Sequence, residues 1–280
     1  MAFCAERDSD PLDPNVNSLM DFLSFLFYEK NLSYSSLNTA RSAVSTFSLA
    51  KKVSLGSHPL VIQFMKGIFN LKPRLPRTKV TWDTGLVLKF LQSWHPSNNL
   101  SLLQLSMKVV MLCLLITGQR GQTIWSLNIQ NITWGKDYVK CRIGDILKTS
   151  SSKHHQDELK FDAYPQSKAL CVVHYLNKYV QRTQKLRGKE QKLFISTRPP
   201  YKGISRETLA RWTKECMEKS GVNMKIFTPH STRSASTSKA ATRIMMPTIL
   251  KTAGWRSSST FAKYYKKPIL DEGTNVKHLF

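Results

Sequence analysis

Two residues in the last third of the chain have side chains that can act together on an oxyanion. The stretch HSTR contains His230 and Arg233, three residues apart and directly after Pro229. Proline favours the first turn of a helix, and residues three apart share one helical face. Histidine can transfer a proton near neutral pH, and arginine presents a planar fork of N–H donors. A capped helix with one exposed arginine explains the same four letters, so other residues must decide between the two interpretations.

A second arginine lies in a glycine-rich stretch. Arg120 is found in TGQRGQT, close to Gly118 and Gly121, after a long apolar segment. Because glycine is unfavourable inside a helix, this stretch predicts a tight turn that directs the guanidinium toward a partner. An arginine in an ordinary surface loop fits the stretch equally well.

Aromatic residues and cations alternate near the C-terminus. The segment AGWRSSSTFAKYYKKP contains Trp255 and the adjacent Tyr264 and Tyr265, with Lys and Arg residues between and after them. Aromatic residues among lysines are common on any basic surface, so this segment indicates little when it is taken alone.

Net charge limits the partners that the chain can have. Lys and Arg total 42 against 18 acidic residues, which gives a formal net charge of +24. Such an excess costs self-repulsion unless a polyanion is bound, so nucleic acid is the first expected partner and an anionic membrane the second. The longest apolar run, Val109 to Ile116, is far shorter than the roughly 18 to 20 residues of a membrane span. The acidic N-terminus has no hydrophobic signal region, so we expect neither a signal peptide nor a membrane partner.

The cysteines and histidines predict no metal site. The five cysteines lie far apart and form no CxxC pair, and the adjacent His154 and His155 belong to a polar stretch that is expected to be a loop. This pattern argues against a disulfide framework and a zinc site, and it is typical of a reducing, intracellular compartment.

Apolar spacing divides the chain into two parts. Stripes at helical spacing, from Asn15 to Glu29, after Ser35 and after Pro59, predict a small helical module over residues 1–72. Residues 73–80 are rich in proline and basic residues and are expected to be a linker. Residues 81–280 are expected to be mainly helical with a small sheet. Predicted helices cover residues 83–94, 102–117, 167–185 and 205–220, with one after the FTPH stretch and one from Pro247; predicted strands cover 138–143, 158–163 and 193–195.

Taken in order, three motifs resemble those of the tyrosine recombinases, also called the phage-integrase family. They are TGQRGQT, FTPHSTRSAS and AGWRSSSTFAKYYKKP. More narrowly, the sequence is similar to the recombinases of DIRS-type and Ngaro-type retrotransposons of eukaryotes. The resemblance covers about residues 79 to 269, whereas the N-terminal helices are similar to the family's core-binding, SAM-like module only in size and position. It implies a mainly α fold with a small antiparallel sheet and a mixed α+β catalytic domain over residues 81–280.

The resemblance implies an enzyme that breaks and rejoins double-stranded DNA. Members of the family cleave a phosphodiester with a tyrosine, which leaves a 3′-phosphotyrosine and a free 5′-hydroxyl, and they use no metal ion and no nucleotide cofactor. It also implies a synaptic tetramer on DNA, no small-molecule substrate and a nuclear location. Two alternatives stay open: a DNA-binding protein without catalysis that derives from a retrotransposon recombinase, and a type IB topoisomerase, which relaxes one duplex alone.

The resemblance also assigns roles to residues that meet the scissile phosphate. Arg120 and Arg233 match the arginines that neutralise the pentavalent phosphorane, and His230 matches the proton-transfer group. Trp255 matches a position that is histidine or tryptophan in the family, and its indole N–H can donate to a phosphate oxygen. A lysine between two strands usually protonates the leaving 5′-oxygen, and Lys148 in ILKTSSS is the candidate, with Lys153 as an alternative.

The nucleophile is one of two adjacent tyrosines. Tyr264 lies nine residues after Trp255, which is the common bacterial spacing, whereas Tyr265 fits the retrotransposon pattern of an aromatic residue and then the tyrosine shortly before Lys-Pro. We predict Tyr265 as the nucleophile, with Tyr264 as second choice. Thr123 stands where many relatives carry an acid, three residues after Arg120, so any supporting carboxylate must come from elsewhere.

Overall fold

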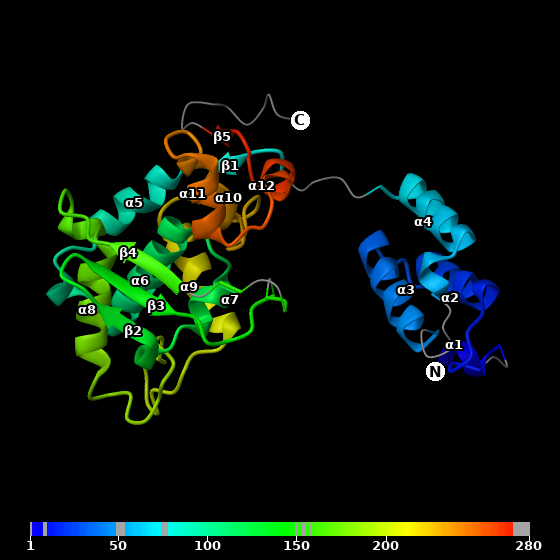
Figure 1. The fold of residues 1–280 in the computed structure, drawn as a ribbon, viewed down its shortest axis with the longest axis horizontal. Helices are drawn as coiled ribbons and strands as arrows, with labels where there is room; N and C mark the ends of the chain where they lie inside the picture. The colour runs from blue at the N-terminus through cyan, green and yellow to red at the C-terminus, as the bar shows by residue number, and fades with distance from the viewer. Residues whose placement is uncertain are drawn as a thin grey trace. The chain divides into compact units, whose positions relative to one another are not determined.

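The chain divides into two units, residues 1–77 and 78–280, which are described separately (Figure 1). The computed structural model describes residues 2–7, 10–48, 54–73, 78–148, 150–152, 155–156 and 158–270. Within these ranges, no helix combines the length and the apolar character that crossing a membrane requires.

The N-terminal unit is a helical module with its own small core. Its helices are α1 (Ala2–Ala5), α2 (Val16–Tyr28), α3 (Tyr34–Ser48) and α4 (Pro59–Leu71). Asn15 begins α2 with a reciprocal cap, in which Asn15 Oδ1 accepts from the Ser18 N–H and Ser18 Oγ accepts from the Asn15 N–H, both at 2.9 Å. Buried apolar residues of α2, α3 and α4 form the core. The three helices predicted from apolar stripes are confirmed.

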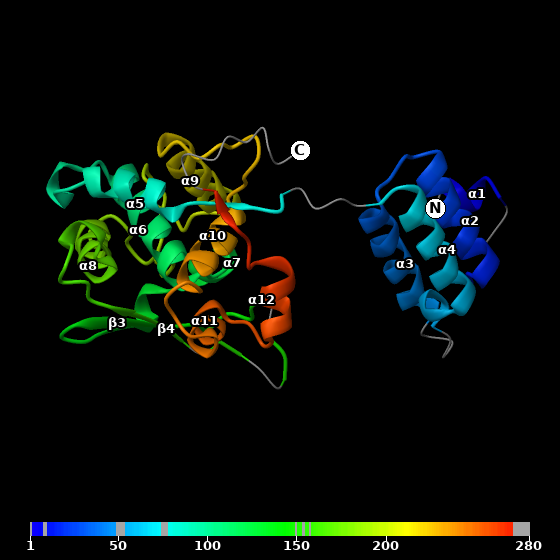
Figure 2. The same cartoon turned by 90° about the horizontal axis from the view of Figure 1, so that it is seen from above.

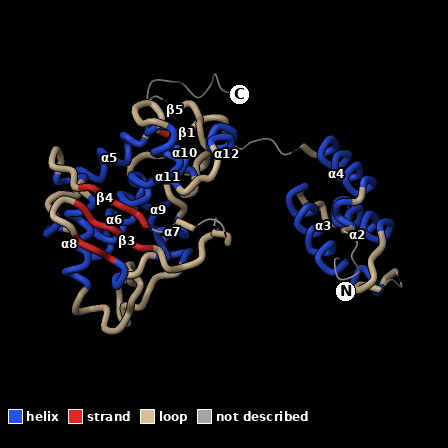
Figure 3. Tube along the Cα trace, viewed as in Figure 1, coloured by secondary structure: helices blue, strands red, loops and turns tan. Residues whose placement is uncertain are grey.

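The second unit packs helices around one apolar helix. Every residue of α6 (Leu102–Thr117) from Leu105 to Leu114 is buried, and α8 (Val172–Thr183), α9 (Arg206–Lys219) and α10 (Ser231–Ala240) contact it. A three-stranded sheet lies beside α8 (Figure 3). The helices α10, α11 and α12 gather at one end of this unit (Figure 2). The other helices are α5 (Thr84–Ser93), α7 (Gly121–Ser126), α11 (Met246–Ala253) and α12 (Ser258–Tyr264).

The sheet is antiparallel, in the order β2 (Ile132–Trp134), β3 (Tyr138–Arg142), β4 (Glu158–Asp162). Along β3 and β4, buried residues alternate with more exposed ones, as expected for a sheet with one face on the core. The predicted strands over 138–143 and 158–163 are confirmed to within one residue. The fold class, mainly α with a small antiparallel sheet, is confirmed as well.

One predicted strand is wrong, and three short strands, β1 (Thr81–Trp82), β2 and β5 (Ile269–Leu270), were missed. Leu193, Phe194 and Ile195 are buried, but this segment forms only isolated bridges, Asn128 with Lys192 and Ile195 with Gly203. A short apolar run indicates burial but cannot by itself show that a ladder forms. The missed strand β2 has only three residues, and none of them is buried, so it carries no such signal.

A short parallel pair joins the beginning and the end of the described part of this unit. Thr81 of β1 (Thr81–Trp82) pairs with Ile269 of β5 (Ile269–Leu270). The indole of Trp82 also donates to Ser231 Oγ of α10 at 2.9 Å. The same strand therefore holds both the start of α10 and the segment that follows α12.

Candidate active site

The turn between α6 and α7 carries Arg120. Gly118 ends α6 with a left-handed backbone (φ +59°), and a Cβ at this position would lie 2.5 Å from Thr237 Cγ2 of α10. Glycine is therefore required both for the turn and for the close approach of α10. Arg120 is half-buried at the N-terminal boundary of α7, and its guanidinium has no hydrogen-bond or ion-pair partner among the described residues. The predicted tight turn is confirmed.

Arg233 lies inside the protein, on α10. It is 2% exposed, and its Nη1 donates to the Gly118 carbonyl at 2.7 Å, which ties α10 to the α6–α7 turn. Its Nε and Nη2 are buried without a hydrogen-bond acceptor among the described residues. Burial, followed by the charge of Arg120, lowers the pKa of Arg233, although Tyr265 opposes this shift and the group stays charged at neutral pH. The Tyr265 side chain also interacts with this guanidinium, but by geometry neither Nε nor Nη2 has an acceptor among the described residues, so an oxygen supplied by a ligand would stabilise them.

Two aromatic rings pack against the guanidinium of Arg233. Its Cζ lies 4.0 Å from the ring centroid of Trp255 and 5.2 Å from that of Tyr265. The two ring centroids are 4.7 Å apart. Trp255 Nε1 is also buried without an acceptor among the described residues. Three N–H donors with unsatisfied hydrogen bonds are therefore gathered on two side chains in direct contact.

The two adjacent tyrosines have different surroundings. Tyr264 is the last residue of α12 and is 57% exposed. Tyr265 follows the helix with a non-helical φ of −123°, and its ring centroid lies 6.2 Å from that of His230. Its carbonyl accepts from Ser238 Oγ at 2.8 Å, which fixes the segment against α10. The structure brings Tyr265 together with His230, Arg233 and Trp255 and leaves Tyr264 at the surface; the role of nucleophile stays a prediction.

His230 directly precedes α10, which begins at Ser231. The residue is exposed as a whole, yet its ring is packed among cations, and loss of surrounding water is the first cause that lowers its pKa. Nearby positive charges lower the pKa further, in the order Arg233, Arg120, Lys148 and Lys267. His230 is therefore neutral near pH 7 and can accept a proton.

The loop between β3 and β4 carries Lys148 in an exposed turn. The charge of Lys148 acts on His230, which places this lysine near the other predicted site residues. The loop is tied to the segment after α11, because Arg256 Nη2 donates to Ser151 Oγ at 2.6 Å. Lys153, the alternative candidate, lies outside the described residues.

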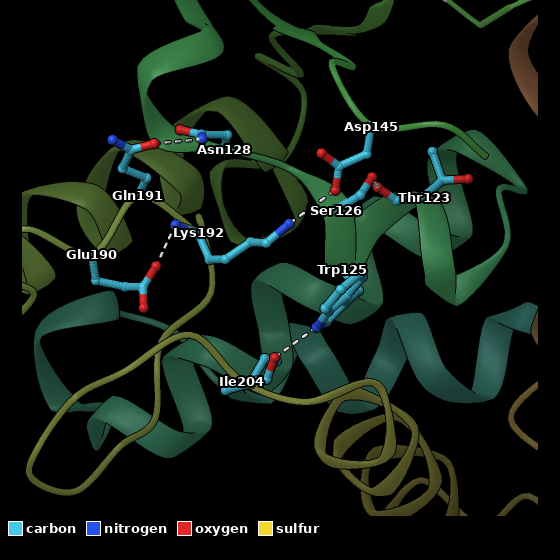
Figure 4. A network of polar contacts seen from close by, with 9 residues as sticks. All are labelled: Thr123, Trp125, Ser126, Asn128, Asp145, Glu190, Gln191, Lys192 and Ile204. Carbon is cyan, nitrogen blue, oxygen red and sulfur yellow. Dashed lines mark hydrogen bonds and ion pairs between the residues drawn. The ribbon is translucent and has the colours of Figure 1, made fainter.

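A network that the sequence did not indicate links α7, this loop and α9. Trp125 of α7 donates its indole N–H to the Ile204 carbonyl at 2.6 Å (Figure 4). Lys192 Nζ lies 4.5 Å from the Trp125 ring centroid and 3.0 Å from Asp145 Oδ2 in the β3–β4 loop. Arg206 Cζ, at the start of α9, lies 4.7 Å from the same ring centroid. No local spacing joins these residues, which lie far apart in the sequence.

A cleft of about 230 Å³ brings the cations together. Arg120, Arg206, His230 and Arg233 line it, and among the described residues no acidic side chain does. Thr123 donates its hydroxyl to Gln119 Oε1 at 3.1 Å, and no described carboxylate forms an ion pair with Arg120 or Arg233. Larger hollows of about 520 and 750 Å³ lie elsewhere and contain none of the predicted site residues. The chemistry of the 230 Å³ cleft fits an anion.

Comparison with known proteins gives one family and several solved structures. The model of the phage integrase family matches residues 89–268. No significant match was found among curated protein sequences. Similar solved structures include XerH recombinase in a post-cleavage complex with palindromic difH substrate (14% identity, TM-score 0.61, 91% of this chain and 70% of that one). A lambda integrase tetramer bound to a Holliday junction is similar as well (16% identity, TM-score 0.57, 96% of this chain and 70% of that one). XerA recombinase is another (18% identity, TM-score 0.50, 97% of this chain and 84% of that one). At these identities the structural likeness establishes the fold alone.

Proposed function

Because this chain belongs to the phage integrase family, we propose that it is an active tyrosine recombinase that cleaves and rejoins double-stranded DNA through a 3′-phosphotyrosine intermediate. The observation that carries the proposal is the group of buried donors beside Tyr265, namely Nε and Nη2 of Arg233 and Nε1 of Trp255. The non-bridging oxygens of one phosphate would give these donors their missing acceptors, next to the hydroxyl that attacks.

The cleavage step assigns one task to each residue. The Tyr265 oxygen attacks phosphorus, and its proton passes to His230, whose lowered pKa keeps the ring neutral. The guanidinium groups of Arg120 and Arg233 neutralise the charge that develops on the phosphorane. The bond to the 5′-oxygen then breaks, and Lys148 donates a proton to that oxygen. Attack of a 5′-hydroxyl on the phosphotyrosine reverses these steps and rejoins the strand.

Assembly, origin and location are proposed on other grounds. A relative of the same fold was solved as a tetramer on a Holliday junction, which supports a synaptic tetramer on DNA for this chain. Membership of the DIRS or Ngaro branch, and with it a nuclear location, rests on the motif resemblance alone. We propose no membrane partner and no small-molecule substrate.

The proposal is tested with a trapped intermediate. Duplexes that the full chain binds are first enriched from a random-sequence library, and nicked suicide substrates are then made from them. We expect a covalent protein–DNA adduct on denaturing gels, formed in the presence of a chelator and without ATP. Binding without any adduct would instead support the inactive DNA-binding protein.

Two further measurements separate the alternatives. The logarithm of DNA affinity should fall against the logarithm of salt concentration with a slope of magnitude about 5 or more, because many phosphate contacts release counterions. A type IB topoisomerase would relax supercoiled plasmid as a monomer on one duplex, whereas a recombinase should form adducts on two synapsed sites.

A further inference from the structure

The cleft contains a cation to which the cleavage step assigns no task. Arg206 is the first residue of α9, is exposed, and lines the cleft together with Arg120, His230 and Arg233. None of the described residues accepts a hydrogen bond from its guanidinium or forms an ion pair with it. The charge of the adjacent Glu207 acts on Arg206 without forming an ion pair, and no acidic side chain among the described residues lines the cleft itself.

The Trp125 ring holds Arg206 in place. The indole N–H bond to the Ile204 carbonyl fixes the orientation of the ring, and Arg206 Cζ lies 4.7 Å from its centroid. A guanidinium stacks well on an indole, and stacking leaves the N–H donors at its edge free for a ligand. A flexible side chain that is already positioned loses less entropy when it binds.

The second cation on the same ring differs from Arg206. Lys192 Nζ contacts Trp125 as well, but Asp145 neutralises it at 3.0 Å (Figure 4). Among the described residues, no carboxylate forms an ion pair with Arg206, and only the charge of the adjacent Glu207 acts on it. Of the two cations on this tryptophan, Arg206 is thus the one whose charge is left for an external anion.

We propose that Arg206 binds a backbone phosphate of the DNA directly next to the phosphate that is cleaved. The proposal rests on the proposed function for the identity of the polyanion. Arg206 has none of the ring contacts that join Arg233 to Trp255 and Tyr265, so it lies in the cleft without belonging to that group. A contact to a neighbouring phosphate is the same before and during cleavage, so it contributes to affinity and not to the rate of the bound complex.

A phosphate-by-phosphate measurement tests this assignment. Single methylphosphonates, which remove the charge of one phosphate, are placed along the bound duplex, and affinity is measured for wild type and Arg206→Ala. At the contacted position, wild type should lose roughly tenfold in affinity whereas Arg206→Ala loses almost nothing further. The same measurement with Arg120→Ala identifies the phosphate that Arg120 contacts. The phosphate that is coupled to Arg206 should be the next one along the DNA backbone.

Arg211→Ala is the matched control, because it removes an exposed arginine of the same helix that lies outside the cleft. It should show no coupling next to the Arg120 position. Parallel losses for wild type and Arg206→Ala at every position would overturn the proposal. Because the reference is the phosphate coupled to Arg120, the outcome can be read even if wild type forms no adduct, which would count only against the proposed function.

Two more measurements show whether Arg206 contributes to DNA affinity alone and whether the Trp125 ring positions it. At saturating DNA, Arg206→Ala should form adduct within a few-fold of the wild-type rate, and its salt slope should be smaller in magnitude by about 0.9. Trp125→Leu should reproduce the weakened coupling at the same phosphate, while Arg206 itself is unchanged. Full coupling in a folded Trp125→Leu protein would contradict the role of the ring.

Discussion

The helices α10 to α12 and the β3–β4 loop contribute to the same predicted site in different ways. On the helical side, Arg233 and Trp255 are buried, and their donors lack acceptors. On the loop side, Lys148 is exposed, and contacts such as those of Asp145 and Ser151 attach the loop to the rest of the unit. The charge that stabilises the phosphorane is therefore built into the core, whereas the proposed proton donor lies on an exposed loop that is attached by polar surface contacts and by the buried side chain of Leu147.

This difference has an energetic reason. Preorganised donors in a site with little water stabilise developing charge strongly, because no reorganisation is needed during the reaction. The lysine must contact only one oxygen, to which it gives a proton during cleavage and from which it takes the proton back when the strand is rejoined. Changes to the side chains of the helical side should therefore have large effects, and changes to the contacts that attach the loop, as opposed to Lys148 itself, should have small ones.

The largest effect is expected at the nucleophile. Tyr265→Phe should abolish the covalent adduct while it preserves fold and DNA affinity, because only the attacking oxygen is removed. Tyr264→Phe is the matched control and should retain the adduct, since Tyr264 is 57% exposed and outside the aromatic group. Mass spectrometry of the peptide left on trapped DNA identifies the tyrosine. A phosphotyrosyl bond at residue 264 would reverse the assignment.

The next largest effect is expected at the arginines. Arg120→Ala and Arg233→Ala should each lose roughly 10²-fold or more in cleavage rate, and clearly less in affinity, about tenfold for the loss of one phosphate contact, because many other cations remain. Arg233→Lys should not restore the rate, since lysine lacks the planar fork that bonds Gly118 and leaves further donors beside Trp255. Single-turnover cleavage and binding are measured separately. Parallel loss of both would show that the arginines only position the DNA.

A pH profile should report His230. Its lowered pKa means that the proton-accepting form is present at pH 6.5 and is lost only as pH falls through the lower folded value. At limiting DNA, where kcat/KM reports the groups of the free protein, the rate should fall about tenfold for each pH unit below that value, and His230→Gln should lack this limb. The same shift makes folding less favourable in acid, because the unfolded state binds the proton more tightly. An acid limb that sets in well above pH 6.5 would contradict the lowered pKa.

The sequence predicted those parts of the site that depend on local patterns. The glycines around Arg120 indicated the turn, and the HSTR spacing indicated that His230 and Arg233 share one helix start. Motif order supplied Trp255 and Tyr265, and the structure brings these residues together, although their roles stay predictions.

What the sequence could not predict depends on contacts between distant segments. The burial of Arg233 against Gly118, the pairing of β1 with β5, and the Trp125 network all join residues that no periodicity relates. Arg206 was visible at the start of a predicted helix, but the ring that holds it was not. The apolar character of residues 193–195 reflects burial and not strand pairing, so it predicts a strand that the structure does not contain.

The smallest effect is expected at the attachment of the β3–β4 loop. Asp145 lies three residues before Lys148, and its Oδ2 forms an ion pair with Lys192 Nζ at 3.0 Å. This partly exposed ion pair stabilises the attached position of the loop by about 0.2–1 kcal/mol. Asp145→Asn should therefore slow cleavage by no more than about fivefold, without changing affinity, because only the fraction of molecules with Lys148 in place decreases. Asp162→Asn, which breaks the exposed pair of Asp162 with Lys160 on β4, removes the same charge and should leave the rate unchanged. A substrate whose 5′-leaving group needs no proton should remove the defect of Asp145→Asn. If the defect persisted with that substrate, Asp145 would act on the arginine side of the site, through Lys192 and Trp125, and the division between a buried charge clamp and a surface-held proton donor would not hold.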